Sequence, residues 1–176
     1  MNSLSTLDVK YVKGIGPKKA ELLASELGIR TAADLLRHYP NNYVDRSKCY
    51  TVSELNGEMP YAQIRGSFIA MNIVGEGAKM RLTASFTDGR RTMEVVWFRK
   101  IRQIRESIRL GMEYILFGKP ARYGSMWQMV HPEIDAPQSA GAREGFRGIY
   151  PLTEKLRSRG VISRNFFVWT QGVLES

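Results

Sequence analysis

Residues 80–89 read Met-Arg-Leu-Thr-Ala-Ser-Phe-Thr-Asp-Gly and contain the clearest fold signal in the chain. Apolar and polar residues alternate as far as Phe86, which is the pattern of a β-strand with one buried face. Thr87-Asp88-Gly89 then indicates a turn, and residues 92–98 (Thr-Met-Glu-Val-Val-Trp-Phe) indicate another strand. The stretch therefore predicts a β-hairpin.

Three further strands and a helix are predicted around this hairpin. Alternation over residues 61–70 indicates a first strand, and residues 114–117 and 126–130 indicate a fourth and a fifth. A helix is expected from about residue 100 to residue 109, with Gly111 ending it. The predicted order is strand-strand-strand-helix-strand-strand.

This order over about 75 residues is that of an OB-fold, a small closed Greek-key barrel. Gly66 and Gly118 fall where the strands of such a barrel bend sharply. Many other short β-domains share this composition, so the pattern alone leaves the barrel type open. With the helices that precede it, the chain is expected to be an α+β protein: a short helix-hairpin-helix-like segment followed by a five-stranded OB-fold barrel.

The N-terminal segment contains a glycine-rich turn at residues 12–20, Val-Lys-Gly-Ile-Gly-Pro-Lys-Lys-Ala. The two glycines allow positive φ, and Pro17 suits the first turn of a helix. Free amides at that helix N-terminus would bind an anion such as a nucleic-acid phosphate. The alternative is a plain turn between helices with solvated lysines. The candidate phosphate-binding residues are Lys13, Gly14, Gly16, Lys18 and Lys19.

Short helices flank this turn. Gly28 ends the helix that follows it as a C′ residue. Thr31 can cap the next helix, and Pro40 stops it. This arrangement is a helix-hairpin-helix pattern.

Trp97 and Phe98 lie at the end of the third predicted strand, where an aromatic pair meets a basic helix. Adjacent strand residues face opposite ways, so one ring should be buried, and we expect at least one to be exposed. An exposed ring beside arginines suits stacking on bases and gripping phosphates. The alternative is a core aromatic with arginines that are merely solvated.

The arginines after this pair are spaced by three, three and four residues, which would put them on one helical face opposite three isoleucines. The candidate phosphate-binding residues here are Arg99, Lys100, Arg102 and Arg105, with Arg109 on the same face. Arg90 and Arg91 in the preceding hairpin form a second candidate group, although loop tips often carry arginines without function.

The overall charge favours a polyanionic partner. Lys and Arg number 26 against 17 Asp and Glu, which gives a net charge of +9. A membrane surface is the less favoured polyanion, because we find no long apolar run and no basic amphipathic helix. The N-terminus Met-Asn-Ser-Leu-Ser has no signal-peptide character, so the cytoplasm is the expected location.

No catalytic residue, metal site or cofactor is predicted. Gly118-Lys119 precedes Pro120, where a nucleotide-binding P-loop needs Ser or Thr for magnesium. One cysteine, Cys49, and two histidines are too few for a disulfide or a convincing metal site. His131-Pro132-Glu133 has no nucleophile and no orienting partner, so we interpret it as structural.

The expected domains are a helical segment over residues 1–50, a barrel over 51–135 and a linker over 136–148, where small and polar residues gather. Residues 149–176 start a new element. About 28 residues cannot bury their apolar side chains alone, so this tail either packs on the barrel or belongs to an absent domain. The pattern stops midway at Ser176, as in a fragment.

A set of short motifs, taken in their order along the chain, resembles the N-terminal region of the bacterial ATP-dependent DNA helicase RecG family. The resemblance covers nearly the whole chain, and its specificity comes from the ordered set. The motifs are Gly14-Ile-Gly-Pro-Lys-Lys-Ala, Leu27-Gly28-Ile29, Asp34-Leu35-Leu36, Tyr39-Pro40-x-x-Tyr43-x-Asp45-Arg46, Phe86-x-Asp88-Gly89, Trp97-Phe98, Gly111, Gly118-Lys119, His131-Pro132-Glu133 and Tyr150-Pro151-Leu152-Thr153-Glu154.

The resemblance implies an OB-fold wedge domain that binds branched DNA at stalled replication forks and Holliday junctions. The wedge would hold strands apart, contacting single-stranded DNA at the junction, while downstream motor domains use ATP and Mg²⁺. Phe98 matches the family's stacking aromatic, with Trp97 beside it. The family often has a second aromatic about four residues on, near Arg102 here, so an arginine plane would stack instead.

The resemblance also makes residues 149–176 the start of a connection to an absent motor. The chain alone should therefore bind DNA without hydrolysing ATP. Two other functions remain open. A stand-alone OB-fold protein would bind single-stranded DNA or RNA, and a protein-interaction domain would carry its charge for solubility. Only the nucleic-acid binders should lose orders of magnitude in affinity between about 50 and 200 mM salt.

Overall fold

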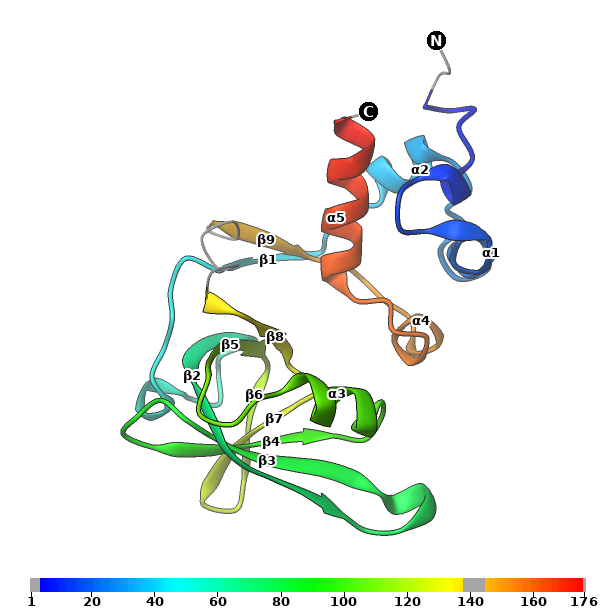
Figure 1. Cartoon of the computed structure of the whole chain (residues 1–176). Coiled ribbons are helices and arrows are strands. Elements are labelled where there is room, and N and C mark those ends of the chain that lie inside the picture. The colour runs from blue at the N-terminus through cyan, green and yellow to red at the C-terminus, as the bar shows by residue number, and fades with distance from the viewer. Residues whose placement is uncertain (1–3, 138–144, 176) are drawn as a thin grey trace. The chain divides into compact units, whose positions relative to one another are not determined.

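The computed structural model describes residues 4–137 and 145–175 (Figure 1). Contacts divide the chain into two compact units. The helical unit comprises Met1–Val44 with Phe146–Ser176, and the barrel unit comprises Asp45–Gly145. Each unit has its own hydrophobic core, and the mixture of helices and strands confirms the predicted α+β class.

One curled sheet builds the barrel unit (Figure 1), in the strand order β6-β7-β4-β3-β2-β5-β8. The β4–β7 pair is parallel, and the other neighbours pair antiparallel. The elements of this unit are η2 (Val52–Glu54), β2 (Ala62–Val74), η3 (Gly77–Lys79), β3 (Arg81–Thr87), β4 (Thr92–Trp97), α3 (Ile101–Ser107), β5 (Glu113–Gly118), β6 (Pro120–Tyr123), β7 (Met126–Val130) and β8 (Glu133–Asp135).

A sharp bend closes the barrel. Only Lys119 separates Gly118, the last residue of β5, from Pro120, the first residue of β6. Because β5 pairs with β2 and β6 pairs with β7, this bent strand joins the two ends of the sheet into a ring. The ring runs β2-β3-β4-β7-β6/β5, and α3 lies between β4 and β5 in the chain, which is the predicted OB-fold barrel.

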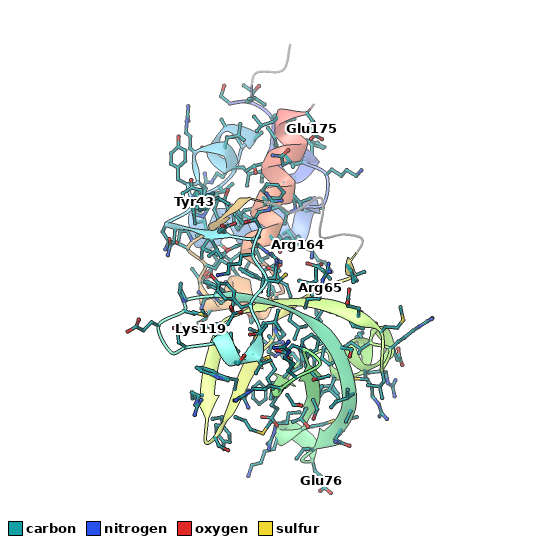
Figure 2. All side chains as sticks on the ribbon, turned by 90° about the vertical axis from the view of Figure 1, so that its left-hand side faces the viewer. Tyr43, Arg65, Glu76, Lys119, Arg164 and Glu175 are labelled. Atoms are coloured by element: carbon teal, nitrogen blue, oxygen red, sulfur yellow. The ribbon has the colours of Figure 1, made fainter. Side chains whose placement is uncertain are left out.

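All five predicted strands are present, and one is much longer than expected. β2 covers 13 residues and forms with β3 a hairpin whose tip carries Glu76 (Figure 2). The β2–β3 register shifts between Phe68 and Ala70, which marks a β-bulge. At Gly66 the strand passes so close to β3 that a Cβ would overlap the Thr87 carbonyl oxygen, as the sharp bend predicted there requires.

The barrel core consists of the apolar residues that alternate along the strands. Phe68 lies at its centre, with ring centroids 5.0 Å from Phe86 and 6.0 Å from Trp97. The largest fully buried side chains of this core are Ile64, Phe68, Leu82, Phe86, Met93, Trp97 and Leu116.

A buried arginine ties the start of the barrel unit to the sheet. Arg46 is 6% exposed, and its guanidinium carbon lies 3.8 Å from the centroid of the Phe117 ring. Its Nη1 donates to Glu133 Oε2 at 3.0 Å, and its Nη2 is 3.7 Å from Asp135 Oδ2. Two carboxylates thus compensate one buried cation, and we interpret this charged group of three residues as structural.

The helical unit contains helices from both ends of the chain and a two-stranded sheet. Its elements are η1 (Val9–Tyr11), α1 (Gly16–Leu27), α2 (Ala32–Arg37), β1 (Asn42–Asp45), β9 (Phe146–Ile149), α4 (Glu154–Ser158) and α5 (Ser163–Leu174). The glycine-rich turn lies between η1 and α1, so the element before the turn is a single 3₁₀ turn.

The predicted end of α1 and the predicted start of α2 are confirmed, whereas α2 ends at Arg37, before the Pro40 that was expected to stop it. Gly28 ends α1 in the left-handed region at φ +69°. Thr31 caps α2: its hydroxyl accepts from Asp34 N–H, and the Asp34 carboxylate accepts from Thr31 N–H, at 3.1 and 3.0 Å. This reciprocal pair is a capping box.

The tail packs where neither expectation placed it. Leu156, Phe166 and Trp169 share one core with Leu23 and Leu35 of the N-terminal helices. The N-terminal helices and the tail therefore form one unit, because each supplies apolar surface that the other covers. The barrel unit begins at residue 45 instead of 51. Of the linker expected over 136–148, residues 138–144 lie outside the described part.

The close approach at Gly66 gives a stability prediction. Gly66→Ala should lower the free energy of unfolding by about 1–3 kcal/mol, because the methyl group meets backbone that cannot move aside. Gly57→Ala is the matched control, since nothing lies within 4 Å of its Cβ position, and it should stay within about 0.5 kcal/mol of the parent. Urea denaturation of the three proteins measures both values, and equal stability of the two variants would contradict the bend.

Candidate nucleic-acid interface

At the end of β4, the two candidate stacking residues differ in exposure. Trp97 is 2% exposed and lies in the barrel core, whereas Phe98 is 55% exposed. The cause is strand alternation: Trp97 pairs with the buried Leu82 and points inward, so the next side chain points outward. Of the two candidate stacking residues, Phe98 is therefore the one that solvent or a base can reach.

Basic residues follow Phe98 directly. Arg99 and Lys100 are exposed, and Lys100 adopts a left-handed conformation at φ +54° before α3 begins. Arg102 and Arg105 are exposed on α3. An exposed ring followed along the chain by four exposed cations is suited to stacking on a base and contacting its phosphates.

The expected stripe of four arginines on one helix is wrong in its extent. α3 ends at Ser107 and begins at Ile101, because Lys100 leaves the helical region, so Arg99 and Arg109 lie outside it. The inner face is as expected, since Ile101, Ile104 and Ile108 pack against the barrel core. Of the four arginines, only Arg102 and Arg105 therefore lie on α3 with the spacing that puts them on one helical face.

His131 is a neighbour of Phe98 that sequence interpretation missed. Phe98 N–H donates to His131 Nε2 at 3.0 Å, and the two ring centroids are 6.2 Å apart. Partial burial, helped by the Arg99 charge, lowers the pKa of His131 below its ordinary value. The two residues are 33 positions apart, so no local pattern could have joined them.

Arg90 and Arg91 lie at the other end of β4. Their backbone N–H groups donate to Asp88 Oδ1 at 2.9 and 2.8 Å, which shapes the β3–β4 turn, and both side chains are exposed. Six strand residues separate them from Phe98, a distance of roughly 20 Å at 3.3 Å per residue. The structure therefore does not bring this group to the aromatic site.

The glycine-rich turn belongs to the helical unit and has internal partners. Gly14 and Gly16 have φ of +92° and +65°, as predicted. Lys19 Nζ donates to Gly14 O at 3.0 Å and lies 5.8 Å from the Trp169 ring centroid. A Cβ on Gly14 would stand 3.2 Å from Trp169 Nε1, so this turn is also a packing surface for α5.

Lys13 and Lys18 are exposed beside the same turn. They remain candidates for phosphate contact, together with the backbone of Gly16 at the start of α1.

Among the helices of residues 4–137 and 145–175, none combines the length and the apolar character that a membrane crossing requires. Within the same ranges, no three His, Cys, Asp or Glu side chains gather closely enough to hold a metal ion.

The fold and the site define a class of protein: an α+β protein whose OB-fold barrel presents the exposed ring of Phe98 with exposed basic residues directly after it in the chain. The family model described as the RecG wedge domain matches residues 8–167. The chain belongs to the RecG wedge domain family.

Curated relatives and a solved structure agree with this assignment. ATP-dependent DNA helicase RecG of Escherichia coli (strain K12) is 27% identical over 159 residues, which cover 88% of this chain and 22% of that protein. RecG of Thermotoga maritima is 35% identical over 96 residues, 54% of this chain and 12% of its own length.

The structure of RecG bound to a three-way DNA junction matches 92% of this chain and 22% of its own, with a TM-score of 0.66 at 24% identity, which supports the fold. The chain thus spans about a fifth of the length of the Escherichia coli relative.

Because the two aromatic rings point in opposite directions, their removal should lower stability by very different amounts. Trp97→Ala should lower the free energy of unfolding by about 3–5 kcal/mol, because it leaves a cavity beside Phe68. Phe98→Ala should lower it by no more than about 1 kcal/mol, because more than half of the residue is exposed. Urea denaturation distinguishes the two, and a large loss for Phe98→Ala would mean that this ring is structural.

Proposed function

We propose that this chain is a DNA-binding wedge module that binds branched DNA and separates strands at the branch point. The observation that carries the proposal is Phe98, an exposed ring fixed at the end of a barrel strand and followed by Arg99 and Lys100. Such a ring can stack on the last base pair or on an unpaired base at a junction, while the cations bind the flanking phosphates.

The relatives support this proposal through their names. The curated relatives are ATP-dependent DNA helicases, and the RecG structure with the same fold was solved bound to a three-way DNA junction. The names extend only to a DNA helicase and a three-way junction. From the resemblance of the sequence motifs we further propose stalled forks and Holliday junctions as substrates, and fork regression or branch migration in recombination and repair as the process. The cytoplasm is the proposed location.

In the whole protein, motor domains outside these residues would bind ATP and Mg²⁺ and move the DNA. The chain itself would supply grip and strand separation. Its surplus of basic over acidic residues gives a sequence-independent attraction to the DNA backbone. Arg99, Lys100, Arg102 and Arg105 would act near the branch, and Lys13, Lys18, Arg90 and Arg91 would contact phosphates elsewhere.

A three-substrate comparison tests the proposal. The purified chain is titrated against a three-way fork, matched duplex and matched single strand by fluorescence anisotropy at two salt concentrations. Preference for the fork supports the wedge. Preference for the single strand supports the stand-alone OB-fold alternative. No salt-dependent binding to any of the three overturns both.

Phe98→Ala should weaken fork binding more than duplex binding. Loss of one stacked base costs about 1–3 kcal/mol, or roughly 5- to 150-fold in affinity. Phe146→Ala, which removes a ring that is 72% exposed in the helical unit, is the matched control and should leave fork binding unchanged. Equal losses of fork and duplex affinity in Phe98→Ala would mean that Phe98 does not contact the branch point.

Charge removal on α3 should flatten the salt dependence. Each lost phosphate contact lowers the slope of log K against log salt by about 0.9, so Arg102→Ala/Arg105→Ala should lower it by up to about 2. Arg157→Ala/Arg159→Ala removes the same charge from exposed positions at α4 and should change the slope less. An identical effect of the two double variants would mean that only net charge matters.

A further inference from the structure

His131 replaces a backbone group in the β4–β7 ladder. Val96 pairs with Val130, and His131 N–H donates to Val96 O at 2.9 Å, as in a regular parallel pair. If the ladder continued, Phe98 N–H would bond to the His131 carbonyl oxygen. It donates instead to the His131 side chain, at Nε2.

Two residues near this side-chain hydrogen bond have strained backbone conformations. Among the described residues, His131 (φ +48°) and Lys100 (φ +54°) are the non-glycine residues with positive φ. Such conformations are costly for a residue with a Cβ and persist only where the surrounding structure imposes them. His131 makes the hydrogen bond to Phe98, and Lys100 lies two residues after Phe98, so both strained residues adjoin the segment that carries the exposed ring.

We propose that His131 is a positioning residue that holds Phe98 for contact with the DNA branch by acting as a neutral hydrogen-bond acceptor. This rests on the proposed function, which places Phe98 at the branch. The imidazole fixes the backbone amide from which the Phe98 ring projects, and its own ring lies beside the phenyl ring at 6.2 Å. A fixed ring loses less conformational freedom when it stacks on a base.

The charge state of the imidazole then matters. A neutral ring with its proton on Nδ1 can accept from Phe98 N–H at Nε2, whereas a protonated ring donates at both nitrogens and cannot accept. Arg99 is the charged residue facing His131, and Glu133 is occupied by Arg46 at 3.0 Å. Both partial burial and the Arg99 charge lower the pKa of His131, so the accepting form predominates at neutral pH.

The pH dependence has a definite sign. The fork-over-duplex preference should be complete at pH 8 and should fall below about pH 6.5, as protons bind Nε2. Protonation also adds a positive charge, which strengthens binding to fork and duplex alike. The ratio of the two affinities is therefore the quantity to measure, and we expect it to fall about 2- to 10-fold, the effect of one hydrogen bond.

Two variants separate this role from a structural one. In His131→Gln the side-chain Oε1 can occupy the place of Nε2 without titrating, so the preference should persist and stay flat between pH 5 and 8. In His131→Ala the acceptor is gone, and the preference should be low at every pH. Urea denaturation at each pH identifies the range in which all three proteins are folded, and the ratios are compared there.

A second readout does not depend on DNA. In ¹H–¹⁵N NMR spectra of the free chain, the Phe98 amide should shift along the titration curve of the His131 ring, and the shift should vanish in His131→Gln. A Phe98 amide that ignores the titration overturns the positioning role whatever the DNA results.

The two proposals fail in different ways. Suppose that Phe98→Ala abolishes the fork preference, but that neither pH nor His131→Ala changes it. This result overturns the positioning role of His131 and keeps the wedge function. Absence of any fork preference, with the NMR coupling intact, overturns the wedge function and with it the positioning of Phe98 for a DNA branch.

Discussion

The parallel pairing of β4 with β7 is the contact on which the rest of the barrel unit depends. The other neighbours are antiparallel, and this pair joins the β2-β3-β4 meander to the β6–β7 hairpin. Its register also orients the end of β4: with Val96 opposite Val130, Trp97 lies in the core and Phe98 leaves the ladder beside His131. The pairing that joins the two halves of the sheet thus also places the candidate stacking ring beside His131.

Local pattern predicted the barrel elements well, and long-range contact explains what it missed. Strand alternation and turn residues are properties of neighbours in sequence, so the five strands and α3 could be found. The extension of β2 to Val74 depends on pairing with β3, and the short strand β8 depends on pairing with β5. The tail needed knowledge of the N-terminal core, because Trp169 packs against Gly14, 155 positions earlier.

The site shows the same division. Alternation implied that Trp97 and Phe98 face opposite ways, but alternation alone cannot say which side of a strand is the core. The pairing of Trp97 with Leu82 decides it. The arginine stripe was overextended because helical spacing assumes a helix, and Lys100 in a left-handed conformation delays the start of α3. His131 could not be joined to Phe98 from sequence, because their contact depends on strand register.

Charge and aromatic stacking place different demands on the fold. Attraction between exposed cations and a phosphate backbone acts over about 8–10 Å at physiological salt, so flexible arginines and lysines can serve it from many positions. Stacking on a base requires a ring at one place and one tilt. The structure reflects this difference: Arg102 and Arg105 are exposed on α3, whereas Phe98 follows the end of β4, donates to the His131 imidazole and lies two residues before the strained Lys100. Discrimination between a branch and plain duplex should therefore depend on the positioned ring, and general DNA affinity on the exposed cations.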